Sequence, residues 1–221
     1  MPSSRKRTAV LASGGGTNLQ ALIDAASDTD FPAEIALVLT NVGGAFCLER
    51  ARRAGIEGLV IDHRQFESRE AFEAAMDREL RDRNIELICL AGFMRVLQDR
   101  FVNDWHDRML NIHPSLLPKY KGLHTHARAL AAGDSLHGCT VHLVRAALDD
   151  GPMILQAQVP VLADDDEDTL QKRVLVREHE IYPRALALLA EGRVDVRGPD
   201  AWIDGTKGPL VLLPELGEAR L

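Results

Sequence analysis

Four short apolar runs in the first half of the chain restrict its fold more than any other feature. They contain almost no polar residues, and segments with helical periodicity separate them. One of these predicted helices begins after Ser68, a residue type that is a good N-cap. Strands that are apolar on both sides are buried on both faces, as in a parallel sheet covered by helices. We therefore expect an α/β fold with a doubly wound, mostly parallel sheet. The four predicted strands cover residues 9–12, 35–39, 59–61 and 87–91.

Strand patterns in the second half indicate a different arrangement. A strand is predicted over residues 109–113, and two further strands, over 139–144 and 153–161, are separated by a short turn. This spacing favours an antiparallel pair, so we expect the sheet to have an antiparallel C-terminal part. A long helix is predicted from about Asp165 to Ala190.

The end of the chain lacks a clear pattern. Residues 200–221 contain prolines and glycines and little periodicity. We therefore expect a single domain over residues 1–199 and an irregular C-terminal tail over residues 200–221.

Composition disfavours several classes of protein. The 33 acidic residues outnumber the 26 basic ones, whereas a protein that wraps nucleic acid usually carries a basic surplus. No apolar run approaches the roughly 18 residues of a membrane span, and residues 1–8 lack the apolar core of a secretory signal. The three cysteines, Cys47, Cys89 and Cys139, lie far apart and favour neither a disulfide framework nor a zinc site. We expect a cytoplasmic protein that acts on small molecules, either a monomer or a homodimer.

A glycine-rich loop follows the first predicted strand and leads into a helix. Gly14, Gly15 and Gly16 would bring backbone N–H groups of the helix start toward an anion, although a tight turn would also use glycines here. A dinucleotide fingerprint would have glycine where Leu19 stands and an acid where Asn41 stands, and no Walker lysine is present. The loop therefore favours a single phosphate over NAD or ATP.

Two polar side chains lie close together at the end of the strand predicted over residues 109–113. Asn111 and His113 point to the same face because strand residues alternate, and Pro114 then ends the strand. Ligands bind at this edge of an open α/β sheet, where Asn can hold an oxyanion and His can move a proton. A structural His–Asn pair and a metal site at His124 and His126 are the alternatives.

Seven motifs in the chain resemble the phosphoribosylglycinamide formyltransferase family of folate-dependent purine biosynthesis. They occur in family order and span nearly the whole sequence. The resemblance implies a Rossmann-like formyltransferase fold, with a phosphate-binding half over residues 1–105 and a catalytic and folate-binding half over 106–199. The motifs are SGGGTNLQALI from Ser13, SREAF from Ser68, LAGFMRVL from Leu90, LNIHPSLLPKYKGLHTH from Leu110, HGCTVHLV from His137, LDDGPMILQ from Leu148 and EHEIYP from Glu178.

The resemblance also implies the site residues and the co-substrate, 10-formyltetrahydrofolate, with no metal. Asn111, His113 and Asp149 are implied to be catalytic. The ribonucleotide is expected at Gly16, Thr17, Asn18 and Glu178. The folate is expected at Arg69, Met94, Arg95, Val96, Leu97, Asn111, Arg145, Ala146, Ala147, Leu148 and Asp149. The chain departs from the family pattern at Lys121, where Pro is common, and at Asp150, where Gly is common.

The implied reaction matches these residue types. The substrate amine attacks the formyl carbon, so donors must meet a tetrahedral oxyanion, and we expect Asn111 and His113 to supply them. Asp149 is expected to raise the pKa of His113 and to organise a water for proton transfer. We expect the three residues to share one cleft, with His113 between the other two.

Glu178 stands out within the predicted long helix. A helical wheel places it in the middle of an apolar arc, where a carboxylate without a partner is costly. Either a structural arginine pairs with Glu178 or the side chain reaches a ligand.

Related and unrelated functions remain as alternatives. A methionyl-tRNA formyltransferase would carry a further C-terminal domain and a basic surface, and a formyltetrahydrofolate hydrolase an N-terminal regulatory domain. A sugar-nucleotide formyltransferase is a third relative, which the SGGGTN loop makes less favoured. A non-catalytic phosphate-binding module would not require Asn111, His113 and Asp149 to converge.

Overall fold

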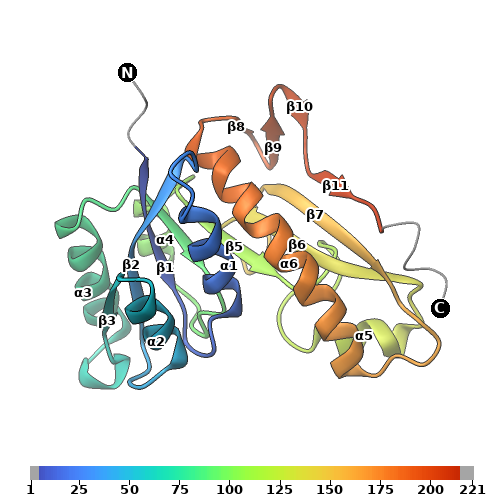
Figure 1. Cartoon of the computed structure of the whole chain (residues 1–221), viewed down its shortest axis with the longest axis horizontal. Helices are drawn as coiled ribbons and strands as arrows, with labels where there is room; N and C mark the ends of the chain where they lie inside the picture. The colour runs from blue at the N-terminus through green and yellow to red at the C-terminus, as the bar shows by residue number, and fades with distance from the viewer. Residues whose placement is uncertain (1–4, 215–221) are drawn as a thin grey trace.

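The computed structural model describes residues 5–214, and an eight-stranded sheet forms its centre (Figure 1). The strand order is β11-β7-β6-β5-β4-β1-β2-β3. The pairs from β3 to β5 are parallel, β6 is antiparallel to both of its neighbours, and β11 is parallel to β7. The predicted α/β class, with a mostly parallel sheet and an antiparallel C-terminal part, is confirmed. The strands are β1 Lys6–Leu11, β2 Ala33–Thr40, β3 Glu57–Val60, β4 Leu87–Leu90, β5 Met109–His113, β6 Leu136–Leu143, β7 Met153–Pro160 and β11 Leu210–Leu212.

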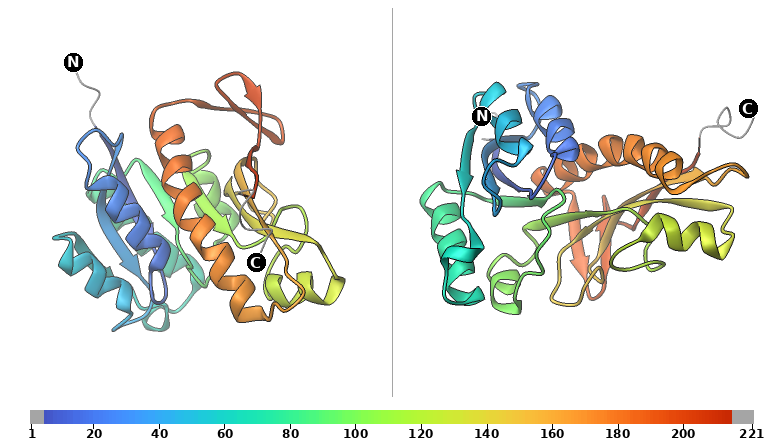
Figure 2. Two further views of the ribbon diagram at one scale, coloured as in Figure 1. Left: turned by 45° about the vertical axis from the view of Figure 1, so that its right-hand side comes forward. Right: turned by 90° about the horizontal axis from the view of Figure 1, so that it is seen from below.

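Helices cover both faces of this sheet, with α1 and α6 on one face and α3 and α4 on the other (Figure 2). Ser68 caps α3, because its hydroxyl accepts a hydrogen bond from the Ala71 N–H. The long helix α6 carries a capping box at Asp166 and Thr169. The helices are α1 Thr17–Ala26, α2 Phe46–Arg53, α3 Arg69–Asp82, α4 Asp99–Asp104, α5 Thr125–Ala132 and α6 Glu167–Ala190, with a 3₁₀ turn at His63–Gln65.

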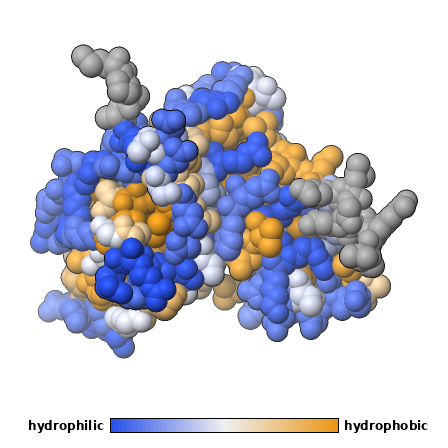
Figure 3. All heavy atoms as spheres, in the orientation of Figure 1, coloured by the Kyte–Doolittle hydropathy of each residue, from blue (hydrophilic) through white to orange (hydrophobic). Residues whose placement is uncertain are grey.

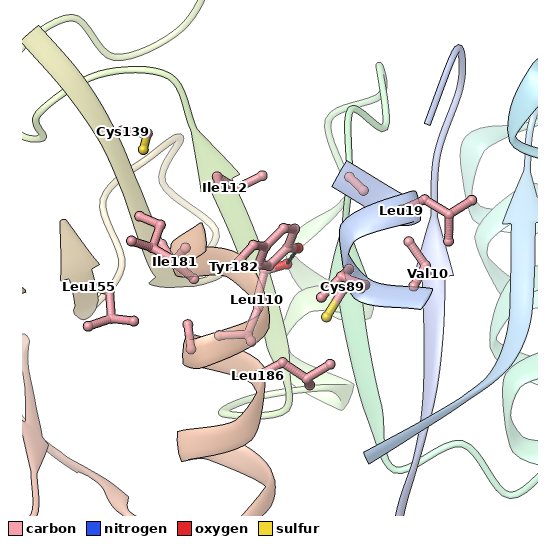
Figure 4. Packing of buried hydrophobic residues seen from close by; sticks show 14 of the residues in the cluster. Val10, Leu19, Cys89, Leu110, Ile112, Cys139, Leu155, Ile181, Tyr182 and Leu186 are labelled. Atoms are coloured by element: carbon pink, nitrogen blue, oxygen red, sulfur yellow. Dashed lines mark hydrogen bonds between the residues drawn. The ribbon is translucent and has the colours of Figure 1, made fainter. Parts of the chain in front are cut away.

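The core divides into two apolar clusters, one on each face of the sheet. In β1, Val10 packs on the α6 side, whereas Ala9 and Leu11 pack on the α3 side. This alternation explains why the predicted strands are apolar throughout. Figure 4 shows Tyr182 of α6 inside the first cluster, where its hydroxyl lies 2.9 Å from the Leu90 carbonyl oxygen of β4.

The cysteines are part of this core. Cys47, Cys89 and Cys139 are free and buried, and Cys89 and Cys139 appear among the apolar side chains of Figure 4. Burial raises the pKa of Cys89 to about 12, so its thiol stays protonated at neutral pH. These cysteines act as small apolar side chains.

The C-terminal segment differs from the expected irregular tail. Strands β8 Val194–Arg197, β9 Asp200–Ile203 and β10 Thr206–Lys207 form a small antiparallel sheet, and β11 joins the main sheet. The expectation is therefore wrong for residues 200–212, because strands of two to four residues are too short to show periodicity in a sequence. Residues 215–221 of the expected tail lie outside the described residues.

The face shown in Figure 3 is mostly hydrophilic, and apolar side chains are visible on it around the C-terminal strands. Val211 of β11 is 44% exposed and Leu213 is 68% exposed. Within residues 5–214, no helix is both long and apolar enough to cross a membrane.

Candidate active site

The glycine loop joins β1 to α1 and is held by α2. Gly16 has a φ of +68°, and a Cβ at this position would lie 3.0 Å from the Cβ of Cys47, so the turn requires glycine. The Gly14 carbonyl accepts a hydrogen bond from the Cys47 N–H, and the Gly15 carbonyl accepts one from Nε of Arg50 at 2.7 Å. Both carbonyls are thus occupied by α2. The first N–H groups of α1, beginning at Thr17, have no side-chain cap and suit an anion.

Glu178 of α6 meets this loop. Nδ2 of Asn18 donates to Oε2 of Glu178 at 2.6 Å, and Glu178 is 8% exposed. Burial raises the pKa of Glu178, and the hydrogen bond from Asn18 partly opposes that rise. The neighbouring Arg177 forms an ion pair with Glu180. The structure therefore brings two of the predicted ribonucleotide residues together.

The second cluster forms at the carboxyl end of β5. His113 and Asp149 are both almost fully buried, and Nδ1 of His113 lies 3.4 Å from Oδ2 of Asp149. Nε2 of His113 lies 2.9 Å from the Tyr120 carbonyl oxygen, so it donates to that oxygen. The Gly122 N–H donates to Oδ2 of Asp149 at 2.8 Å. The segment around residues 120–122 thus holds both side chains in place.

Sequence reasoning missed one member of this cluster, His142 of β6. Its Nε2 lies 3.2 Å from Nδ2 of Asn111 and 3.7 Å from Oδ1 of Asp149. The contacts therefore run from Asn111 through His142 and Asp149 to His113, so the expected central position of His113 is wrong. The antiparallel register pairs Asn111 with His142. Alternation along β6 would place His142 on the same face of the sheet as Asn111, but only if the pairing of these two residues were already known.

Burial controls the charges in the cluster. The pKa of His113 is lowered, chiefly because burial disfavours the imidazolium, while the Tyr120 carbonyl and the charge of Asp149 oppose this. The expected net rise is wrong, since Asp149 offsets only part of the burial. Burial acts to raise the pKa of Asp149, but the neighbouring His142, the hydrogen bond from the Gly122 N–H and the nearby His113 outweigh it, so that pKa is lowered.

The predicted folate residues lie on an exposed surface beside this cluster. Met94, Val96 and Leu148 are 70%, 59% and 55% exposed, which is unusual for large apolar side chains. The guanidinium of Arg69 donates to the Val96 carbonyl oxygen. Arg95 stacks over the ring of Phe72, Arg145 pairs with Asp107, and Ala146 and Ala147 are exposed. Four of the predicted residues, Arg69, Val96, Leu97 and Ala146, line one groove of about 600 Å³.

The structure does not group His124 and His126 as a metal site. His124 is the N-cap residue of α5, and Nδ1 of His126, in the first turn, lies 3.1 Å from Nε2 of His137. In the part of the chain that the structure describes, no three His, Cys, Asp or Glu residues are grouped to hold a metal ion. Lys121 and Asp150 form an ion pair with each other.

Comparison with known proteins adds independent findings. Residues 6–186 match the formyl transferase family. The chain is 48% identical over 200 residues to phosphoribosylglycinamide formyltransferase of Escherichia coli (strain K12), covering 90% of this chain and 94% of that one. It is 54% identical over 190 residues to the trifunctional purine biosynthetic protein adenosine-3 of Drosophila melanogaster, covering 85% of this chain but only 14% of that longer protein. The solved phosphoribosylglycinamide formyltransferase of Coxiella burnetii superposes with a TM-score of 0.90 at 42% identity, covering 95% of this chain and 100% of that one.

Proposed function

Since the chain belongs to the formyl transferase family, we propose that it transfers a formyl group from 10-formyltetrahydrofolate to the amine of N1-(5-phospho-D-ribosyl)glycinamide in de novo purine (IMP) biosynthesis. One observation carries the proposal. Asn111, His113 and Asp149 are brought into one cluster through His142, although Asp149 and His142 lie far from Asn111 and His113 in the sequence. A non-catalytic phosphate-binding module does not require this convergence. The proposal includes a cytoplasmic location and small molecules as the only substrates.

The two substrates are assigned to the two sides of the cluster. Gly16, Thr17, Asn18 and Glu178 bind the ribonucleotide, with its phosphate at the N-terminus of α1. The groove beside Arg69 and the exposed loop over residues 94–97 bind the folate together with the turn over residues 145–149. Asn111, between these regions, also contacts the folate.

The reaction joins the substrate nitrogen to the formyl carbon and breaks the bond between that carbon and N10 of the folate. Asn111 donates an N–H to the oxyanion that forms in between, and His113, whose two nitrogens face the Tyr120 carbonyl and Asp149, stabilises it through the charge of its imidazolium. Asp149 assists the transfer of a proton from the attacking amine to the leaving nitrogen, through a bound water. Because the amine attacks the formyl carbon directly, no covalent intermediate with the protein forms.

His142 orients the Asn111 amide for this role. Nδ1 of His142 lies 3.0 Å from the Leu143 carbonyl oxygen, so it donates there and leaves the Nε2 lone pair free to accept from Asn111. One N–H of the Asn111 amide is thereby held by His142. The second N–H is available to the oxyanion.

A direct assay tests the proposed function. The purified chain is mixed with 10-formyltetrahydrofolate and the ribonucleotide, and the absorbance of the released tetrahydrofolate is followed. We expect release only when both substrates are present. Release with a sugar-nucleotide amine in place of the ribonucleotide would favour the alternative relative, and release without any amine would indicate a hydrolase.

Glu178 provides a test of the ribonucleotide side. We expect Glu178→Ala to raise the KM for the ribonucleotide by roughly 10- to 100-fold, the range for losing one charged hydrogen bond, with a smaller change in the KM for the folate. Steady-state kinetics with each substrate varied in turn measures both constants. Glu180→Ala is the matched control, because Glu180 is exposed on the same helix and pairs with Arg177. Equal losses for both substrates would support a purely structural carboxylate.

A further inference from the structure

Ser13 occupies the junction between the two substrate-binding loops. It follows β1 and precedes the glycine loop, and its N–H donates to the Gly92 carbonyl oxygen at 3.1 Å. Its hydroxyl oxygen accepts a hydrogen bond from the Met94 N–H at 2.9 Å. Because β1 and β4 are neighbours in the sheet, the loops that follow them lie side by side, and Ser13 connects them through two hydrogen bonds.

Asn41 determines which way the Ser13 hydroxyl points. The hydroxyl donates to Oδ1 of Asn41 at 2.6 Å, and Asn41 is only 4% exposed at the end of β2. A carbonyl-type oxygen can only accept, so the hydroxyl hydrogen is directed to Asn41. The lone pairs of the Ser13 oxygen are then left for the Met94 N–H. A buried partner therefore keeps Ser13 oriented as an acceptor.

The anchored segment leads directly into the exposed folate loop. Gly92 adopts a φ of +71°, and Met94, two residues later, is 70% exposed. An exposed apolar loop of this kind has few packing contacts to define its backbone. The two hydrogen bonds to Ser13 supply a fixed attachment at its start.

We propose that Ser13 is a positioning residue for the folate, which anchors the backbone at Met94 to the glycine loop. The inference rests on the proposed function, because that function assigns the folate to residues 94–97. Ser13 acts through Met94 and does not itself have to touch a substrate. The glycine loop keeps its own attachments to Cys47 and Arg50, so the ribonucleotide side does not depend on the Ser13 hydroxyl.

Ser13→Ala and Asn41→Ala separate this role from a general structural one. Ser13→Ala removes the acceptor of the Met94 N–H, and we expect the KM for 10-formyltetrahydrofolate to rise about five- to tenfold, as for the loss of one neutral hydrogen bond. The KM for the ribonucleotide should stay within about twofold. Asn41→Ala leaves the Ser13 oxygen in place but frees its hydroxyl to rotate, so the folate KM should rise less than in Ser13→Ala, and the melting temperature should fall because a buried amide is lost.

Amide hydrogen exchange provides a readout that needs no substrate. We expect the Met94 amide to exchange fastest in Ser13→Ala, and in Asn41→Ala at a rate between that of Ser13→Ala and the wild type. An unchanged folate KM in Ser13→Ala, or an equal rise in Asn41→Ala, overturns the inference. If the wild-type chain transfers no formyl group, the proposed function fails. The exchange experiment still tests the inference in that case, because it needs no substrate. An unchanged exchange rate at Met94 in Ser13→Ala would show that Ser13 does not anchor this backbone.

Discussion

Replacing His113 by alanine is expected to lower kcat by roughly 10²- to 10³-fold, the range for losing one group that stabilises an oxyanion. The Tyr120 carbonyl holds the imidazole on one side and Asp149 holds it on the other. A water molecule that filled the space left in His113→Ala could not replace the charge of the imidazole at this position. The KM values should change much less, because His113 itself is not among the residues assigned to substrate binding. Steady-state kinetics at saturating concentrations of both substrates measures the loss.

His106→Ala is the matched control for this experiment. His106 also lies beside an aspartate, Asp107, but its side chain is 50% exposed on the loop before β5. We expect His106→Ala to retain wild-type kcat. Since His113 is buried, circular dichroism must confirm that His113→Ala is folded. A folded variant with near-wild-type kcat would remove His113 from the mechanism.

Asp149→Asn is expected to shift the pH dependence of kcat as well as to lower kcat strongly. In the folded protein, burial holds the pKa of His113 below its ordinary value of about 6.5, and the Asp149 charge acts against that shift. Removing the negative charge disfavours the imidazolium, so the pKa of His113 falls further. If the imidazolium stabilises the oxyanion, kcat declines as pH rises through this pKa. The decline should therefore begin at lower pH in Asp149→Asn than in the wild type.

The pH profile distinguishes two roles for the carboxylate. A kcat profile with an unshifted limb in Asp149→Asn would mean that Asp149 positions water without tuning His113. Asp150→Asn is the control, because Asp150 is the next residue but is exposed and pairs with Lys121. We expect Asp150→Asn to leave the limb where it is in the wild type.

A double variant tests whether the two groups act as one unit. His113→Ala combined with Asp149→Asn should be little slower than the slower single variant, because residues that act together give non-additive losses. Losses in kcat that multiply would show that His113 and Asp149 contribute independently.

Local features of the fold could be predicted because they depend on neighbouring residues. Val10 and its neighbours in β1 are apolar because a central strand is buried on both faces, and this pattern appears in the sequence itself. The cap at Ser68 and the glycine turn at Gly16 also depend on a few adjacent residues. In the same way, alternation placed Asn111 and His113 on one face of β5.

Contacts between distant segments were decided only by the tertiary structure. His142 joins the cluster through the register of β5 and β6, and Ser13 meets Met94 through the pairing of β1 and β4. Neither contact leaves a signal in the residues nearby, because pairing partners lie tens of residues apart along the chain. The short strands β8 to β11 likewise depend on their partners for stability.

The chemistry of the cluster shows the same division. The sequence determined which titratable groups are present, and the resemblance of its motifs indicated that Asp149 belongs with His113. The direction of the His113 pKa shift depended on burial, which the expectation of a raised pKa did not include. Desolvation is set by all the atoms that surround a group, and those atoms are brought together only when the chain folds.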